Sequence, residues 1–282
     1  MSCESEEEAL ELITSVKKVC KQGGLHLHKF LSNSTKIMNA IHSSERTAGA
    51  TNVSLCEEKL SAERALGIQW EVETDMFTFS TKLNECAATR RGILSAVSSI
   101  YDPLGFISPF ILCGKIILQE MCRAGTSWDD PLPEQLLPRW EKWKSDCSNL
   151  PEVHIPRCYR PADMKEVERY ELHHFSDGST SGYGQCSYLR IIGKEKVHCV
   201  LVAAKSRVAP IKLVTIPRLE LTAAHVSALM SYTLKEEMNL PIEEEYFWTD
   251  SKVVLSYINN DARRFHVYVA NRLSKRPRLR KA

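Results

Sequence analysis

The sequence predicts an α+β protein in which a small helix–strand unit and a helical unit precede a larger sheet domain. In the first half, apolar residues recur at the three- and four-residue spacings of amphipathic helices. In the second half, three runs of β-type residues are separated by short polar or glycine-containing breaks, as in an antiparallel meander. A long helical run, a short strand and another helix follow them. The 282 residues provide room for about two domains.

The first unit is predicted from helix caps and alternation. Glycines end its first helix, Ser34 caps the second, and alternating residues indicate strands. The predicted elements are a helix over 5–21, a strand over 25–30, a short helix from Ser34 to Ile41, a loop over 42–60, and a hairpin formed by 65–70 and 76–79.

Three helices are predicted next, over 89–100, 107–122 and 133–147. The segment Asp102-Pro103-Leu104-Gly105 separates the first two, because proline and glycine interrupt helices. Residues 150–168 contain three prolines among charged residues and are interpreted as a linker.

The second half is predicted to form the larger sheet domain. Pro217 suits the first turn of its long helix, and Ser251 suits the cap of the last one. The predicted elements are strands over 170–176, 183–190 and 197–205, a long helix from Pro217, a buried strand over 246–249, and a helix from Ser251 to Ile258.

Composition excludes several classes of protein. With 43% hydrophobic residues, 12 Gly and 12 Pro, the chain is neither collagen-like nor disordered. Its charge-free stretches are shorter than the roughly 18 residues of a membrane span, and its acidic start is unlike a signal peptide. Ten cysteines without a C-x-x-C pair favour reduced thiols over disulfides or structural zinc. We therefore expect an intracellular protein, cytoplasmic or nuclear, without a membrane partner.

The net charge of +2 depends on a basic C-terminal end. Residues 263–282 hold eight Lys or Arg and no acid, whereas the rest has 29 basic and 35 acidic residues, a net charge of −6. The stretch 275–281 has three interpretations: a nuclear-localisation-like signal, a phosphate-binding arm, or a sequence without a role after a truncation.

Three acids in the second half are candidates for chemistry. Asp177 follows the first predicted strand, Glu220 begins the long helix, and Asp250 follows the fourth strand. Each acid taken alone has a structural interpretation. Asp177 suits a turn before glycine, Glu220 complements the helix dipole, and Asp250 suits a helix N-cap. If the ends of the first and fourth strands align, the two aspartates meet, and a helix packed across those ends presents Glu220 to both.

Such a cluster predicts a divalent-cation site. Unpaired carboxylates in one pocket repel one another unless cations compensate them. Oxygen ligands select Mg²⁺ or Mn²⁺ rather than zinc. Two such ions about 4 Å apart activate a water and stabilise the leaving oxygen of a phosphodiester.

These motifs resemble those of known families. Three segments are similar to the first three acidic motifs of RNase H domains: Phe175-Ser176-Asp177-Gly178-Ser179, Arg218-Leu219-Glu220-Leu221 and Trp248-Thr249-Asp250-Ser251-Lys252. Three more resemble Pol polyproteins of BEL/Pao-type LTR retrotransposons: Leu66-Gly67-Ile68-Gln69-Trp70, the stretch 95–105 and the stretch 204–210. The resemblance extends over nearly the whole chain.

The resemblance implies a domain organisation. Residues 1–85 resemble the C-terminal part of a reverse-transcriptase palm, 86–150 a helical thumb or connection, and 169–282 a truncated RNase H-like domain after the linker 151–168. The Tyr-x-Asp-Asp motif of the palm is absent, so polymerase activity is not expected. The usual fourth acid of RNase H is also missing, and Asp261 comes too early to replace it. Enzymatic activity is therefore left open.

The leading hypothesis is a retrotransposon-derived Pol fragment that binds RNA–DNA hybrid and hydrolyses its RNA strand. Asp177, Glu220 and Asp250 are then the catalytic ligands of Mg²⁺ or Mn²⁺. The alternative is an inactive remnant that acts at most as a nucleic-acid-binding or interaction module. An aspartic protease is disfavoured, because Asp177-Gly178-Ser179 has its glycine and serine in the wrong order and no second copy.

Basic residues near the acidic motifs are the expected phosphate contacts: Lys205, Arg207 and Lys252. The histidines His173, His174 and His225 are interpreted as strand and helix residues rather than zinc ligands. The five tryptophans are interpreted as core or cap residues rather than base-stacking platforms: Trp70, Trp128, Trp140, Trp143 and Trp248.

Overall fold

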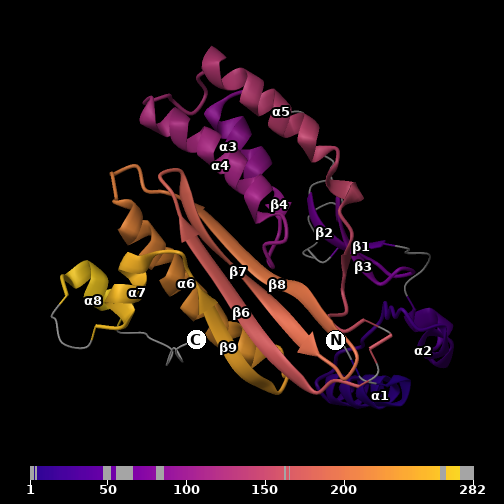
Figure 1. Cartoon of the computed structure of the whole chain (residues 1–282). Coiled ribbons are helices and arrows are strands. Elements are labelled where there is room, and N and C mark those ends of the chain that lie inside the picture. The colour runs from indigo at the N-terminus through magenta and orange to yellow at the C-terminus, as the bar shows by residue number, and fades with distance from the viewer. Residues whose placement is uncertain are drawn as a thin grey trace.

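The chain folds into two mixed units, each built on a β-sheet (Figure 1). The structure is a computed structural model that describes residues 3, 5–46, 52–54, 66–80, 86–161, 163–164, 166–260 and 265–273. Helices and strands occur in both halves, so the predicted α+β class is confirmed. Asp261 and the basic stretch 275–281 lie outside the described residues.

The larger sheet has the strand order β8-β7-β6-β9. Its strands are β6 (Arg169–Gly178), β7 (Gly182–Ile192), β8 (Val197–Val208) and β9 (Ile242–Trp248). The first three form the predicted antiparallel meander, and β9 pairs in parallel with β6. The prediction that the last strand is buried is wrong: in the described sheet β9 is an edge strand, and the Trp248 side chain is 45% exposed.

One long helix, α6 (Ile216–Glu237), covers one face of this sheet (Figure 1). Pro217 lies in its first turn, as predicted, where a missing N–H costs no hydrogen bond. The core beneath it includes Leu172, Leu189 and Leu234. This packing fixes the start of α6 at the end of the sheet where β6 finishes.

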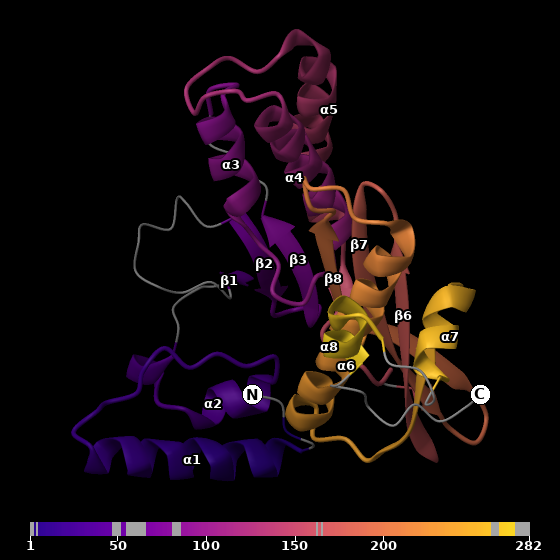
Figure 2. The ribbon, with the colours of Figure 1, turned by 90° about the vertical axis from the view of Figure 1, so that its left-hand side faces the viewer.

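Two short helices, α7 (Lys252–Ile258) and α8 (Val267–Leu273), pack beside α6 (Figure 2). A small apolar cluster of Leu221, Val254 and Val269 joins the three helices. The predicted cap of α7 is confirmed, because Ser251 Oγ accepts a hydrogen bond from the Val254 N–H at 3.2 Å.

The smaller sheet is built from segments between residues 52 and 156. Its strands are β1 (Asn52–Ser54), β2 (Leu66–Glu71), β3 (Met76–Ser80), β4 (Ile100–Tyr101) and β5 (Ile155–Pro156). The predicted hairpin is confirmed, because β2 and β3 pair antiparallel and the opposed Ile68 and Phe79 are both buried. β1 falls in the segment predicted as a loop, where three residues are too short for alternation to be seen.

The segment predicted as a linker contributes to this sheet. Ile155 of β5 pairs with Phe77 of β3, and the Arg157 guanidinium donates to the Asp75 carboxylate with an Nε–Oδ1 distance of 2.5 Å. A two-residue strand has no periodicity, so the sequence does not reveal it. The domain boundaries at residues 85, 150 and 168 stay predictions.

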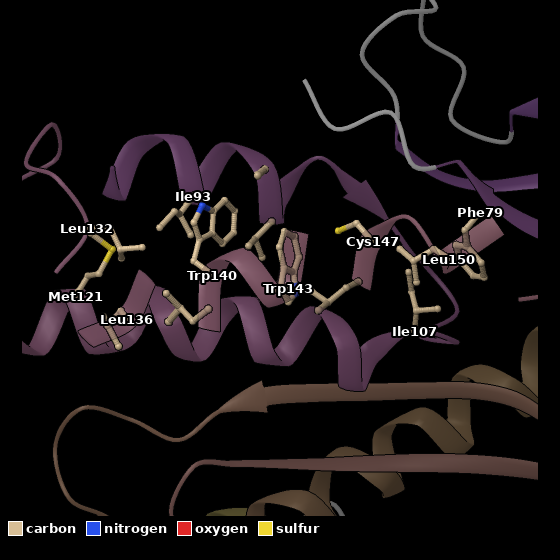
Figure 3. Close-up of a cluster of buried hydrophobic side chains, with 14 of the residues drawn as sticks. Phe79, Ile93, Ile107, Met121, Leu132, Leu136, Trp140, Trp143, Cys147 and Leu150 are labelled. Carbon is tan, nitrogen blue, oxygen red and sulfur yellow. The ribbon is translucent and has the colours of Figure 1, made fainter. Parts of the chain in front are cut away.

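The three predicted helices of the middle region are confirmed. They are α3 (Arg90–Ser98), α4 (Ser108–Arg123) and α5 (Leu137–Cys147), and 3₁₀ turns span Ser43–Glu45, Glu134–Leu136 and Leu150–Glu152. Their shared core holds Trp140 beside Ile93 (Figure 3), and both side chains are fully buried. Gly114 allows the close packing, because a Cβ there would lie 2.6 Å from Val97 Cγ2 and 3.1 Å from Trp143 Cε2.

The helical unit docks on the larger sheet along β8 (Figure 1). The Ala204 N–H donates to the Leu104 carbonyl at 2.7 Å, and the Ser206 hydroxyl donates to the Ser108 carbonyl at 3.0 Å. Gly105 adopts a φ of 78°, and a Cβ at this position would lie 1.9 Å from the Ala204 oxygen. The helix-breaking segment therefore also covers the sheet edge at β8.

The N-terminal region forms α1 (Glu6–Gln22) and α2 (Thr35–Ala40), and Ser5 and Ser34 cap them through their hydroxyls. The strand predicted over 25–30 is wrong. Lys29 has a φ of 62°, which is incompatible with an extended strand, and Phe30 forms only an isolated bridge to Arg46.

None of the helices in the described ranges is long and apolar enough to cross a membrane.

Candidate functional site

The aspartates of the first and third acidic motifs lie at one end of the larger sheet. Phe175 of β6 is in register with Trp248 of the parallel strand β9. Asp177 comes two residues after Phe175, and Asp250 comes two residues after Trp248. Both segments therefore bring a carboxylate to the same end of the sheet. The predicted alignment of the two strand ends is therefore confirmed.

The start of α6 brings Glu220, its fifth residue, to the same place. A Cβ on Gly178 would lie 2.7 Å from the Glu220 nitrogen and 2.8 Å from the Leu219 carbonyl carbon. Only a glycine at the end of β6 lets the helix backbone approach so closely. Leu219 is buried, which anchors this turn and leaves the neighbouring Glu220 half-buried at the rim.

The three carboxylates form one cluster. One ligand oxygen from each of Asp177, Glu220 and Asp250 lies within 4.8 Å of the others. The Ser251 hydroxyl donates to Glu220 Oε2 at 2.5 Å while accepting from the Val254 N–H, so it links the start of α7 to the N-terminal part of α6. The Gly178 N–H lies 2.6 Å from Asp177 Oδ1. The sequence indicates Ser251 as a cap, but its bond to Glu220 depends on tertiary packing.

The donor set fits a hard divalent cation. All three side chains supply oxygen, which Mg²⁺ and Mn²⁺ prefer. Oxygens on opposite sides of a Mg²⁺ ion are about 4.2 Å apart, so small side-chain rotations bring the cluster to coordinating distance. A cation also offsets the mutual repulsion of three carboxylates. Within the described ranges, no fourth acid joins the cluster.

A groove of about 700 Å³ opens beside the cluster. Asp177 and Asp250 line one part of it, and Ser108 and Leu112 of α4 line another. The groove therefore lies where the helical unit meets the sheet. Since α4 and β6 are far apart in the sequence, no local pattern predicts it.

Two exposed aromatic side chains, Phe175 and Trp248, form an aromatic floor in this groove that the sequence did not predict. The rings of Phe175 and Trp248 stack with centroids 6.0 Å apart, and their side chains are 42% and 45% exposed. Trp248 Nε1 donates to His173 Nδ1 at 3.1 Å. Both rings lie on the face opposite α6, because the alternate residues His174 and Glu245 face that helix. The interpretation of Trp248 as a core residue is therefore wrong.

The other tryptophans differ in burial, and the histidines lie on the predicted strand and helix. Trp140 and Trp143 are buried, as predicted, whereas Trp128 is 45% exposed beneath the Arg90 guanidinium. The strand and helix positions predicted for the histidines are confirmed: His173 and His174 lie on β6, and His225 lies on α6.

The three predicted phosphate contacts lie in different surroundings. Lys205 lines the groove beside the acids, and Lys252 is the exposed first residue of α7, two residues after Asp250. Arg207, two residues beyond Lys205 on β8, lines a separate groove. Lys205 also lines that second groove, so it is shared by both grooves, whereas Lys252 lies beside the acidic motifs.

One comparison with known proteins identifies a family for this chain. A family model for the Pao retrotransposon-like RNaseH-like domain matches residues 89–251, which is more than half of the chain. Among curated proteins, no sequence matches the chain. A solved foamy viral protease–reverse transcriptase in complex with an RNA/DNA hybrid is similar with 14% identity and a TM-score of 0.40, covering 75% of this chain. The chain spans 27% of that protein.

The resemblance inferred from the motifs is confirmed, since the matched segment contains all three acids of the cluster and ends at Ser251. The chain belongs to the Pao retrotransposon-like RNaseH-like family.

Proposed function

We propose that the protein binds RNA–DNA hybrid and hydrolyses the RNA strand in a divalent-metal-dependent reaction. The convergence of Asp177, Glu220 and Asp250 within 4.8 Å, on three separate elements, is the observation that carries this proposal. Asp177 and Asp250 are exposed and Glu220 is half-buried, so their oxygens are accessible to a cation, which offsets the repulsion among three neighbouring carboxylates.

In this proposal the three carboxylates bind the cation and the neighbouring Ser251 orients one of them. Asp177, Glu220 and Asp250 hold Mg²⁺ or Mn²⁺, and the Ser251 hydroxyl keeps Glu220 turned toward the aspartates. The bound cation supplies activation of water and stabilisation of the charge that develops on the phosphate oxygens. The rigid junction of β6, β9 and α6 holds the ligands in place, which limits the rearrangement that binding requires.

Basic side chains provide the attraction for the phosphate backbone. Lys205 lines the groove beside the cluster, and Lys252 follows it on α7. Such cations release condensed counterions from nucleic acid when they bind it, which stabilises the complex at low salt. Arg207, which lines a separate groove, is assigned the same role.

The resemblance to Pol polyproteins also carries a proposal for the rest of the chain. Residues 1–85 correspond to the end of a reverse-transcriptase palm, 86–150 to a thumb or connection, and 169–282 to the RNase H-like domain. The expected site of action is intracellular, in the cytoplasm or the nucleus.

Asp177→Asn tests the proposed hydrolysis. The substitution removes the anionic ligand while keeping the side-chain shape, so cleavage of the RNA strand of a labelled hybrid in Mg²⁺ should fall at least a hundredfold. Asp146→Asn is a matched control, because Asp146 is on α5 and pairs only with Lys142 in the described chain. Asp146→Asn should cleave like the wild type, and EDTA should abolish all cleavage.

If the wild type and Asp177→Asn are equally inert in Mg²⁺ and in Mn²⁺, hydrolysis is contradicted. Retained hybrid binding by both inert proteins would then support the alternative of a non-catalytic nucleic-acid-binding module.

A further inference from the structure

A second groove, of about 470 Å³, lies on the face of the larger sheet that α6 covers. Lys205 and Arg207 of β8 line one side, and Asn271 and Arg272 of α8 line the other. The apolar residues Val226, Leu229 and Met230 of α6 also line it. The groove therefore combines a cationic rim with an apolar patch.

The two cations on β8 point to the same side. Lys205 and Arg207 are two residues apart on one strand, so their side chains share a face. Both are exposed, and within the described part of the chain neither forms an ion pair or a hydrogen bond through its side chain. Their charges are thus available to an anion from solution.

The cation on α8 is held in position by its neighbours. Arg272 Nε donates to Thr222 Oγ1 at 3.0 Å, and Nη1 donates to the Tyr268 carbonyl at 3.1 Å. The guanidinium also stacks on the Tyr268 ring, 3.6 Å from its centroid. A fixed guanidinium loses little side-chain entropy when it binds an anion.

Among the described residues that line this groove, none is acidic. Three cations together with the Asn271 amide form the donor set that phosphate oxygens accept from. The apolar patch on α6 offers contact to a sugar ring rather than to a second charge. A sugar–phosphate unit matches both features.

The groove is connected to the acid cluster through shared elements. Lys205 lines both grooves, and Arg207 is aligned through Tyr183 of β7 with Gly178, the residue after Asp177, so the second groove reaches the same end of the sheet. A nucleic acid that crosses the cluster at this end of the sheet can extend to the second groove. We propose that this second groove binds the sugar–phosphate backbone of the hybrid outside the cleavage point, an inference that rests on the proposed function.

Arg207→Glu tests this inference in the full chain. Binding is measured by fluorescence anisotropy of a labelled RNA–DNA hybrid in EDTA, where cleavage does not contribute. Reversing one phosphate-contacting charge should weaken binding roughly tenfold at low salt and lower the salt slope of log K by about 1. Arg207→Lys keeps the charge and should retain most of the affinity.

Lys142→Glu is the matched control, because it makes the same charge change at an exposed position on α5. It should bind hybrid like the wild type. Unchanged circular dichroism of Arg207→Glu shows that the fold is intact, which is expected for an exposed residue near the end of β8.

Wild-type affinity and salt slope in Arg207→Glu would overturn the inference, as would an absence of hybrid binding by the wild type at low salt. Adenosine monophosphate as a second probe distinguishes the source of the phosphate. If Arg207→Glu loses binding of this nucleotide but keeps that of the hybrid, the groove takes free nucleotides and the strand assignment is wrong. If Arg207→Glu weakens hybrid binding while the wild type cleaves nothing in Mg²⁺, the proposed hydrolysis fails and this inference stands.

Discussion

At the scale of single residues, hydrogen bonds link α6 to its neighbours at two places. Ser251 connects Glu220 to the start of α7. Farther along α6, the buried His174 contacts Glu245 through Nε2 at 3.1 Å, and Ser231 donates to the same Glu245 oxygen. Lys235 Nζ donates to the other oxygen at 3.1 Å. An ionised carboxylate only accepts, so His174 carries a proton on Nε2.

The hydrogen bonds around Glu245 make the free energy of unfolding depend on pH. Burial opposes ionisation of Glu245, but hydrogen bonds from His174, Ser231 and Lys235 outweigh it and lower its pKa from 4.5 to about 2. A carboxyl with a depressed pKa in the fold contributes stability above its unfolded pKa and loses it as pH falls toward the folded value. The free energy of unfolding should therefore fall between pH 4.5 and about 2.

Glu245→Gln should flatten this part of the pH profile, because an amide does not titrate. Urea unfolding at several pH values measures it. Glu244→Gln, on an exposed neighbour in the same strand, should keep the wild-type profile. The role of Glu245 is contradicted if both variants follow the wild type over this range.

At the scale of elements, the contact between β6 and α6 decides the geometry of the cluster. Gly178→Ala places a Cβ 2.7 Å from the Glu220 nitrogen, so the N-terminal part of α6 has to move away. We expect a loss of roughly 1–3 kcal/mol in the free energy of unfolding, as for other overpacked sites, and weaker divalent-cation binding.

Gly23→Ala is a suitable control for Gly178→Ala. Gly23 has a φ of −83°, and a Cβ there would lie 3.5 Å from the Cys20 oxygen, an ordinary contact. It should leave cation binding unchanged. Wild-type stability and cation affinity in Gly178→Ala would show that close approach of α6 is not required.

Long elements with clear periodicity were predictable from the sequence, and contacts between distant segments were not. The meander, α6 and the Ser251 cap follow from alternation, helical spacing and capping chemistry. The pairing of Ile155 with Phe77 does not, because it is a contact between segments far apart in the chain. The strand predicted at 25–30 failed because alternation over six residues also occurs in irregular segments, where Lys29 takes a positive φ.

The candidate site was partly predictable for the same reason. Asp177 is the penultimate residue of β6 and Asp250 follows β9 by two residues, so the parallel pairing of the two strands brings them together. The aromatic floor and the Arg272 side of the second groove depend on which face is left exposed. Burial of Trp248 was expected from its apolar character, but its strand lies at the edge of the described sheet.

At the scale of the whole molecule, Gly105 joins the helical unit to the larger sheet. Its φ is 78°, and a Cβ at this position would lie only 1.9 Å from the Ala204 oxygen, which leaves no room for a side chain. Gly105→Ala should therefore break the Ala204–Leu104 hydrogen bond and loosen α4 from β8. Faster hydrogen exchange of the Ala204 amide is the expected result.

Gly125→Ala separates the effect of backbone strain at a positive φ from the effect of a steric clash with Ala204. Gly125 also has a positive φ, of 71°, but nothing lies within 4 Å of its Cβ position. It should lose some stability through backbone strain while Ala204 stays protected. Equal exchange of Ala204 in both variants would contradict the docking role of Gly105.

The central claim is that three carboxylates on β6, α6 and the end of β9 form one divalent-cation site. Isothermal titration calorimetry with Mn²⁺ tests it most directly, because it requires no substrate. The wild type should bind Mn²⁺, Asp177→Asn and Asp250→Asn should each lose most of the affinity, and Asp146→Asn should match the wild type. Equal Mn²⁺ binding by all four proteins, or none by the wild type, would contradict the claim.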